Sequence, residues 1–146
     1  WGGRNNPHTD AIDFVNMNTT GSASDFGNLV ANTGIACAFS SRTRGIWAGG
    51  YSPNDSTTSN KMDLVTIAST GNGTDFGDVR DDGAHAHGTS NSIRGVFAGG
   101  TNPYRNSIDF ITITTTGNGV DWGDLPIASG SYAYAAGLSD SHGGIS

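Results

Sequence analysis

The stretch Arg44-Gly45-Ile46-Trp47-Ala48-Gly49-Gly50 recurs 50 residues later (44 to 94) as Arg94-Gly95-Val96-Phe97-Ala98-Gly99-Gly100. A third glycine pair, Gly2-Gly3, stands near the start of the chain. The second glycines of the pairs lie 47 and 50 residues apart (positions 3, 50 and 100), and the remaining 46 residues with the first 3 make a unit of 49. Such a period predicts stacked units, none of which buries its apolar face alone. We therefore interpret 1–146 as one repeat domain with units at approximately 4–50, 51–100 and 101–146 joined to 1–3.

Each unit carries further motifs in a constant order. An apolar-Asp-apolar triplet precedes Thr-Thr-Gly or Ser-Thr-Gly, and an Asp-aromatic-Gly triplet follows. Because Trp47 and Phe97 recur at fixed places, as do the aromatic residues of the last triplet, we expect these side chains in the core. The triplets are Ile12-Asp13-Phe14, Met62-Asp63-Leu64 and Ile108-Asp109-Phe110, then Asp25-Phe26-Gly27, Asp75-Phe76-Gly77 and Asp121-Trp122-Gly123.

Composition predicts an all-β chain. All 13 acidic residues are Asp, there is no Glu or Gln, and 23 of the 146 residues are Gly, so the residues that best tolerate a helix interior are scarce. Each unit divides into four short β runs. The third run, Ser107 to Thr114, alternates apolar and polar residues as a half-buried strand does.

Two glycine-rich motifs predict backbone geometry. Thr70-Gly71-Asn72-Gly73 and Thr116-Gly117-Asn118-Gly119 contain Asn-Gly, which favours a type I′ hairpin turn. The first unit has Gly21-Ser22-Ala23-Ser24 there, so a different turn is expected. The paired glycines, such as Gly49-Gly50, close the second run, where a residue without Cβ can adopt positive φ or approach a neighbour closely.

Four antiparallel strands in about 50 residues is the pattern of a β-propeller blade. The order from Arg44 to Gly50, then a loop with Asn, Ile-Asp-Phe and Trp122-Gly123-Asp124-Leu125, resembles the kelch-like repeats of propeller proteins. It is more similar to the arrays with Thr-Gly-Asn and Asp-Phe-Gly-Asp-Leu in virion and tail-associated proteins of marine tailed phages. This resemblance implies an extracellular or virion setting. The chain departs from the pattern at Asn28, Val79 and His142.

Three blades are fewer than the roughly 4 to 8 that close a propeller. Ile145-Ser146, read on into Trp1-Gly2-Gly3, recreates the run that ends at Gly50. We therefore expect a partner of the same kind, either in a homodimer with a six-bladed ring or in a longer array. A β-trefoil or β-prism is the alternative fold, because these also use three similar units in a chain of this length.

The loops that follow the glycine pairs are candidate ligand contacts, since exposed loops on a rigid scaffold commonly bind. Their amphipathic and polar side chains can stack on sugars and hydrogen-bond to hydroxyl groups. The innermost β runs add residues that vary between units, because alignment places Ala36, His85 and Tyr132 in one column, and Ala38, His87 and Tyr134 in another. The resulting candidates are His8, Tyr51, Tyr104, Arg105, His85, His87, Tyr132 and Tyr134.

Neither a metal site nor a cofactor is predicted. His85 and His87 stand two residues apart, but spacing fixes no third ligand for zinc. The aspartates recur in every unit, whereas a catalytic site usually breaks the symmetry of a repeat. Asp13, Asp63 and Asp109 are therefore expected to pair with Arg44, Arg94 or backbone amides of an adjoining strand. We expect a non-enzymatic binding or structural module that recognises a glycan or protein. The alternatives are a trefoil or prism lectin and an enzyme that acts on polysaccharide.

Charge and cysteine content limit the partners. The net charge is −6 with seven scattered basic residues, which disfavours nucleic acid or an anionic membrane as a partner. No stretch approaches the roughly 20 apolar residues that span a bilayer, so membrane insertion is not expected. Cys37 lies between two alanines and is expected to be a small core residue rather than a reactive thiol.

Overall fold

The computed structural model describes residues 9–52, 57–83, 87–101, 104–126 and 136–139. Every regular element in these ranges is a β-strand, which confirms the all-β prediction. No helix in the described ranges has the length and apolar character needed to cross a membrane.

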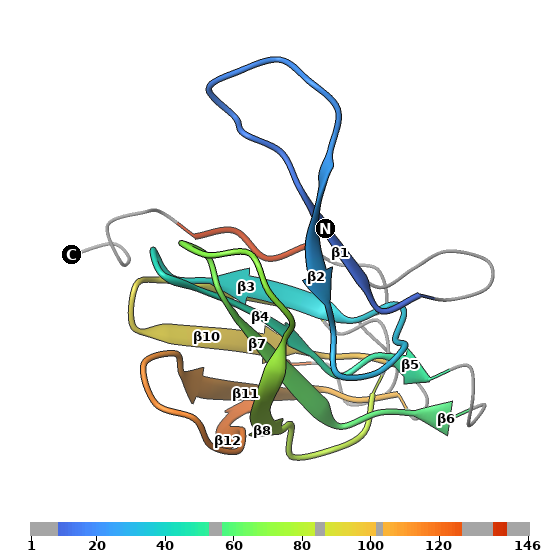
Figure 1. Cartoon of the computed structure of the whole chain (residues 1–146). Helices are drawn as coiled ribbons and strands as arrows, with labels where there is room; N and C mark the ends of the chain where they lie inside the picture. Colours follow the sequence, from blue (N-terminus) through green and yellow to red (C-terminus); the bar gives the residue numbers. More distant parts are fainter. Residues whose placement is uncertain (1–8, 53–56, 84–86, 102–103, 127–135, 140–146) are drawn as a thin grey trace.

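Two four-stranded antiparallel sheets form the body of the molecule (Figure 1). Sheet 1 has the order β3-β4-β7-β8 and sheet 2 the order β9-β10-β11-β12. Two smaller hairpins, β1-β2 and β5-β6, complete the described strands. The bounds are β1 Ala11–Phe14, β2 Ser24–Asn28, β3 Cys37–Ser40, β4 Arg44–Ala48, β5 Tyr51–Ser52, β6 Thr57–Thr58, β7 Lys61–Thr66, β8 Thr74–Asp78, β9 His87–Ser90, β10 Arg94–Ala98, β11 Ser107–Thr112 and β12 Val120–Asp124.

The two sheets repeat each other residue by residue. Asp63 on β7 faces Asp75 on β8, and Asp109 on β11 faces Asp121 on β12, each next to a register shift in the ladder. The β1-β2 hairpin has the same shift beside Asp13. The two four-stranded sheets confirm the predicted number of strands, although each sheet crosses a predicted unit boundary, at 50 or at 100. A structural unit from here on means one such sheet, residues 37–78 or 87–124, with the β1-β2 hairpin as part of the unit before them. The β1-β2 hairpin corresponds to the third and fourth strands of a unit.

The register corrects the predicted alignment of the innermost strands. Cys37 lies opposite Ala48 in sheet 1, and His87 lies opposite Ala98 in sheet 2. Cys37 and His87 are therefore equivalent, whereas the sequence alignment paired His87 with Ala38. Small residues distinguish the two faces of a strand poorly, so the pattern alone left the register weakly specified.

The main core joins the two sheets. Its fully buried side chains include Ile46 and Met62 from sheet 1 and Ile113 from the turn after β11. Cys37 is buried in this cluster, as expected, and burial raises the pKa of its thiol to about 12. The prediction of Trp122 as a core residue is wrong, because its side chain is 54% exposed while the equivalent Phe76 is only 2% exposed.

The Thr-Gly-Asn-Gly motif is not the predicted type I′ turn. The chain reverses just before it, where the Ser69 amide donates to the Thr66 carbonyl. Gly71 and Gly73 then donate their amides to the carbonyls of Phe26 and Asn28, each at 2.7 Å. Contacts with the preceding unit therefore override the local preference of Asn-Gly. Sheet 2 repeats the arrangement, with Gly117 and Gly119 donating to Phe76 and Asp78.

The glycine pairs behave as predicted. Gly49 and Gly50 have φ of 65° and 116°, and Gly99 and Gly100 have φ of 68° and 124°. A Cβ on Gly50 would lie 2.8 Å from the carbonyl oxygen of Gly34. Positive φ and close approach both exclude a larger residue at this place.

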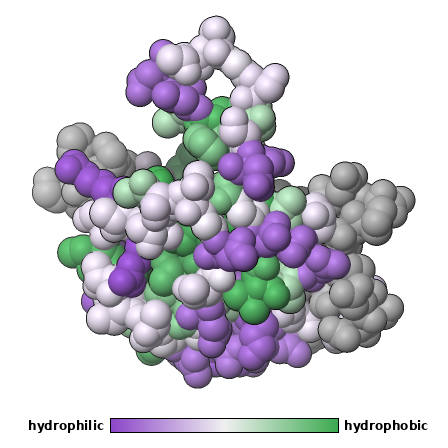
Figure 2. Space-filling model, viewed as in Figure 1, coloured by the Kyte–Doolittle hydropathy of each residue, from purple (hydrophilic) through white to green (hydrophobic). Residues whose placement is uncertain are grey.

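The ends of the repeat series lie far apart. In Figure 1 the β1-β2 hairpin projects from the top of the body, whereas β12 lies at the bottom. Figure 2 shows hydrophobic atoms where this hairpin meets the body. A hollow of about 330 Å³ at this place is lined by Phe14, Phe26, Phe39 and Trp47 among others. The described strands therefore leave apolar surface open at the first end of the series.

Candidate functional site

Two equivalent junctions connect the units. At the first junction, the loop after β2 (residues 29–33) packs against sheet 1. At the second junction, the loop after β8 (residues 79–83) packs against sheet 2. Both junctions contain the paired aspartates of the sheet that receives the loop, Asp63 with Asp75 and Asp109 with Asp121.

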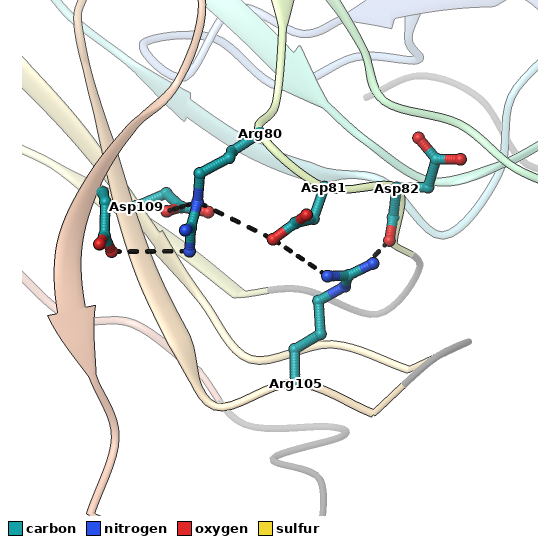
Figure 3. Close-up of polar contacts among 6 residues, drawn as sticks. Arg80, Asp81, Asp82, Arg105 and Asp109 are labelled. Atoms are coloured by element: carbon teal, nitrogen blue, oxygen red, sulfur yellow. Dashed lines mark hydrogen bonds and ion pairs between the residues drawn. The ribbon is translucent and has the colours of Figure 1, made fainter.

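Ion pairs fill the second junction (Figure 3). Arg80 Nε lies 3.1 Å from Asp109 Oδ1, and Arg80 Nη2 lies 3.5 Å from Asp121 Oδ1. Arg105 Nη1 lies 3.0 Å from Asp81 Oδ2, and its Nε donates to the carbonyl of Asp82. Burial raises the pKa of Asp109, and the Arg80 guanidinium opposes part of that rise. A guanidinium thus compensates a buried carboxylate here.

The first junction has the same carboxylates without the arginines. Its loop carries Val30 where the second loop carries Arg80, and Ser59 stands where Arg105 stands. Within the described residues, neither Asp63 nor Asp75 forms an ion pair. The first junction also has Ala31 and Asn32 where the second has Asp81 and Asp82. It therefore keeps the paired aspartates and loses both arginines together with the two acidic residues of the loop.

An open cleft occupies the place of those arginines. Its volume is about 490 Å³, and its walls include Val30, Asn32, Trp47, Asp63 and Asp75. The corresponding space at the second junction measures only about 20 Å³. A cleft of the first size can hold a small ligand or a protruding side chain.

Asp63 dominates the electrostatics of the cleft. It is 8% exposed, and its Oδ2 accepts a hydrogen bond of 3.0 Å from the Val30 amide. Burial raises the pKa of Asp63, the Val30 amide opposes the rise, and Asp75 adds to it. Lys61 also lines the cleft, but its Nζ lies 2.8 Å from Asp78 Oδ1, and this contact raises the pKa of the lysine. The site is therefore an acidic cleft with an aromatic wall.

The structure places only some of the predicted site residues. Tyr51 is half-buried on β5, and its backbone exchanges hydrogen bonds with Gly34. Tyr104 is 71% exposed, and Arg105 belongs to the ion-pair network of the second junction. His87 is half-buried on β9. The remaining candidates, His8, His85, Tyr132 and Tyr134, lie outside the described residues.

The predicted partners of the repeated aspartates are partly right. Asp63 does bind a backbone amide, but it is that of Val30 in the loop after β2 and not one of an adjoining strand. Asp109 pairs with Arg80 and not with Arg44 or Arg94. The side chain of Arg44 donates to the carbonyl of Ile113, and Arg94 lies over aromatic rings. Asp109 pairs with Arg80 because the loop after β8, which carries Arg80, packs against the sheet beside Asp109.

The sequence pattern does not identify the cleft residues as ligand contacts. It predicts a structural role for Asp63 and a core position for Trp47. The differences between Val30 and Arg80 and between Ser59 and Arg105 could have identified the site. An aspartate pair that recurs in each unit, with basic residues beside it in only one, indicates that the units differ in function at this place.

Comparisons complete the description of the site. Among the described residues, no three or more His, Cys, Asp or Glu side chains gather in a way that could hold a metal ion. Neither the known protein families nor the curated proteins include one that matches this chain.

Proposed function

We propose that the chain is a non-enzymatic β-propeller module that completes its ring, or extends an array, with further units of the same repeat. In this proposal the assembled module recognises a glycan or a protein. The observation that carries the proposal is an unfilled docking surface at β12. Its physical basis is the contact that β2 and β8 make with the unit that follows each of them.

Contacts at three equivalent glycines support this proposal. A Cβ on Gly27 would lie 2.3 Å from the Gly71 carbonyl oxygen, and one on Gly77 would lie 2.5 Å from that of Gly117. At the equivalent Gly123, no described atom comes within 4 Å of the Cβ position. Among the described residues, nothing is seated on β12, which has the same bulged pairing as β8 and is proposed to receive an incoming unit.

Side chains at the same end support this reading. The Arg44 guanidinium donates a 2.8 Å hydrogen bond to the Ile113 carbonyl of the following unit. The equivalent Arg94 instead lies over the rings of Phe110 and Trp122, at 5.1 and 5.5 Å from the ring centres. Exposed aromatic and cationic groups of this kind are typical of interface centres.

The β1-β2 hairpin has the matching surface. Met17 occupies the position of Ile113, yet Met17 is 94% exposed while Ile113 is fully buried. Gly21 and Ala23 stand where Gly71 and Gly73 dock on β2. A Cβ at Gly73 would make only ordinary contacts of 3.4 Å or more, so alanine fits there. The hairpin of a second copy can therefore dock on β12.

The setting of the module is part of the same proposal. Its resemblance to phage tail repeats supports a virion or extracellular location, and the cleft supports recognition of a ligand. A carboxylate pair alone gives little support to an enzyme, because Asp63 and Asp75 recur in the other units. We therefore favour the binding module first, the trefoil or prism lectin second, and the polysaccharide-acting enzyme third.

Light scattering over a range of concentrations tests the assembly. We expect a mass of at least twice 15.0 kDa for the unmodified chain. Gly123→Ala puts a methyl group where the incoming carbonyl belongs, and Met17→Asp charges the other surface, so each variant should be a monomer. A mixture of the two should recover a 1:1 dimer, because each supplies the surface that the other lacks.

A folded monomer of the unmodified chain at every concentration would contradict the assembly. That result would favour a closed trefoil or prism lectin. Thermal unfolding of both variants serves as the control, because a loss of mass has meaning only if each chain still unfolds cooperatively. Met17 is the safer position, since its side chain makes almost no contact in the single chain.

A further inference from the structure

We infer that the cleft of the first junction binds the guanidinium group of an arginine side chain presented by a partner protein. This inference rests on the proposal that the chain is a binding module, and it names the chemistry of the ligand. The cleft is separate from the β12 surface. An experiment can therefore contradict arginine binding without contradicting the proposed assembly, and the reverse.

The second junction provides the model for the ligand. There, the guanidinium of Arg80 lies 3.1 Å from Asp109 and 3.5 Å from Asp121, across the same pair of strands that carries Asp63 and Asp75. This is an observed guanidinium complex of the equivalent carboxylates. A cluster of acidic residues without such a counterpart would support no ligand.

The space available matches the missing group. Replacing Arg80 by Val30 and Arg105 by Ser59 removes two long side chains, and a cleft of about 490 Å³ stands in their place. An arginine inserted from outside can reach the carboxylates that Arg80 reaches from inside. The walls do not have to move, because the backbone of the two junctions follows the same register.

The charges of the cleft favour a cation. The Asp63 carboxylate accepts its described hydrogen bond through Oδ2, from an amide, and Asp75 accepts one of 3.2 Å from Gly77. Lys61 also lines the cleft, but its ammonium group lies 2.8 Å from Asp78. A guanidinium donates several hydrogen bonds in one plane and stacks on aromatic rings, so it suits two carboxylates beside Trp47 better than an ammonium group does.

Titration with short peptides tests the inference. The probe is acetyl-Gly-Arg-Gly-amide, followed by the backbone amide resonances of the full 146-residue chain in low salt. We expect one site per chain, with a Kd on the order of 1 mM, as suits a single exposed side chain. The largest shifts should fall on Val30, whose amide donates to Asp63. The citrulline peptide has the same shape without the charge and should bind at least about tenfold more weakly.

Substitutions assign the binding to the cleft. Asp63→Asn and Asp75→Asn should each weaken binding at least about fivefold, because hydrogen bonds to charged groups contribute most. Val30→Arg should abolish it by supplying the guanidinium from within. Asp25→Asn is the matched control, since Asp25 holds the position of Asp75 on the β1-β2 hairpin. It removes the same charge away from the cleft and should leave the affinity unchanged.

Several results would overturn the inference. Equal binding of the arginine and citrulline peptides would show that charge is not recognised. Unchanged affinity in Val30→Arg would place the binding elsewhere. Saturation of the cleft by a neutral oligosaccharide without any arginine binding would also overturn it, while leaving the proposed binding module intact. The mass of the same samples reports separately on assembly.

Discussion

The two junctions of this chain are alike in backbone and differ in whether the paired aspartates have a guanidinium partner. At the second junction, Arg80 compensates Asp109, whereas at the first junction Asp63 faces a cleft with Val30 beside it. Both junctions are joined by the same glycine contacts, Gly71 on β2 and Gly117 on β8. The repeat therefore separates two tasks, since the glycines hold the units together and the loop side chains decide whether a site is open.

This separation shows how a repeat scaffold can gain a site at small structural cost. A buried carboxylate requires a counterion or hydrogen bonds, and Asp63 retains only the amide of Val30 among the described contacts. The scaffold tolerates this because the backbone contacts of the junction, through Gly71 and Gly117, are the same in both copies. The differences at the positions of Arg80 and Arg105 thus convert an internal ion-pair network into an exposed receptor for a cation.

The largest expected effect concerns the contact that both junctions share. Gly77→Ala would place a Cβ 2.5 Å from the Gly117 carbonyl oxygen at a φ of 141°. Backbone strain of about 1–3 kcal/mol and a similar cost of overpacking should lower the free energy of unfolding by roughly 4 kcal/mol in total. Chemical denaturation followed by fluorescence measures this loss.

Gly123→Ala is the matched control, because Gly123 has a φ of 148° and an open Cβ position. It should show the strain cost alone, in a sample diluted until it is monomeric. Equal losses in the two variants would mean that the contact between Gly77 and Gly117 contributes nothing to the junction. The difference between the variants thus measures the shared contact itself.

The next largest effect is expected from a variant in which the second junction resembles the first. Arg80→Val leaves Asp109, whose side chain is 6% exposed, without its guanidinium partner. Because an unpaired buried carboxylate is costly, the melting temperature should fall by at least about 4 °C. With Arg105→Ser added, a second cleft should open and the number of bound arginine peptides should rise from one to two.

Arg42→Val serves as the control, since Arg42 is exposed in the turn between β3 and β4. It removes the same charge and should leave both the melting temperature and the peptide stoichiometry unchanged. A single bound peptide in the double variant Arg80→Val/Arg105→Ser would break the proposed equivalence of the two junctions, even if the stability falls as expected.

The sequence predicted the strands well and the contacts between units poorly. The alternation around Phe110 identified β11, and the glycine pairs gave the positive φ seen at Gly49 and Gly50. These features depend on local backbone preference and on burial of one face, both of which are written in neighbouring residues. A local pattern is enough to specify a strand of this kind.

Features that depend on distant residues were not predictable in the same way. Asn72 was expected in a tight turn, yet its Oδ1 accepts the amide of Asn28 in the preceding unit. Trp122 matches Phe76 in sequence, but only Phe76 is covered by a following unit. The cleft likewise arises from loop residues that meet the sheet across the junction. Each of these outcomes is decided by which unit packs next, which no window of a few residues contains.

The smallest expected effect is the pH dependence that Asp63 gives to the first junction. Because the pKa of Asp63 is raised in the folded chain, the folded state binds the proton more tightly than the unfolded state. Stability should therefore fall as pH rises from the ordinary aspartate pKa through the raised value, and then stay level. Asp63→Asn removes this dependence but can still accept the Val30 amide. Its melting temperature should match that of the unmodified chain at low pH and exceed it by roughly 2 °C near neutrality.

Binding of the arginine peptide provides a second test of the titration of Asp63. Saturation with the arginine peptide should lower the pKa of Asp63, as Arg80 does for Asp109, because a nearby cation favours the carboxylate. The carboxyl resonance of Asp63 should then titrate at lower pH, while that of Asp109 stays unchanged because Arg80 already occupies its junction. Equal shifts at both aspartates would indicate a general effect of the peptide on the chain. A pKa shift confined to Asp63 would mean that the same kind of carboxylate site receives its guanidinium from the peptide at the first junction and from Arg80 at the second.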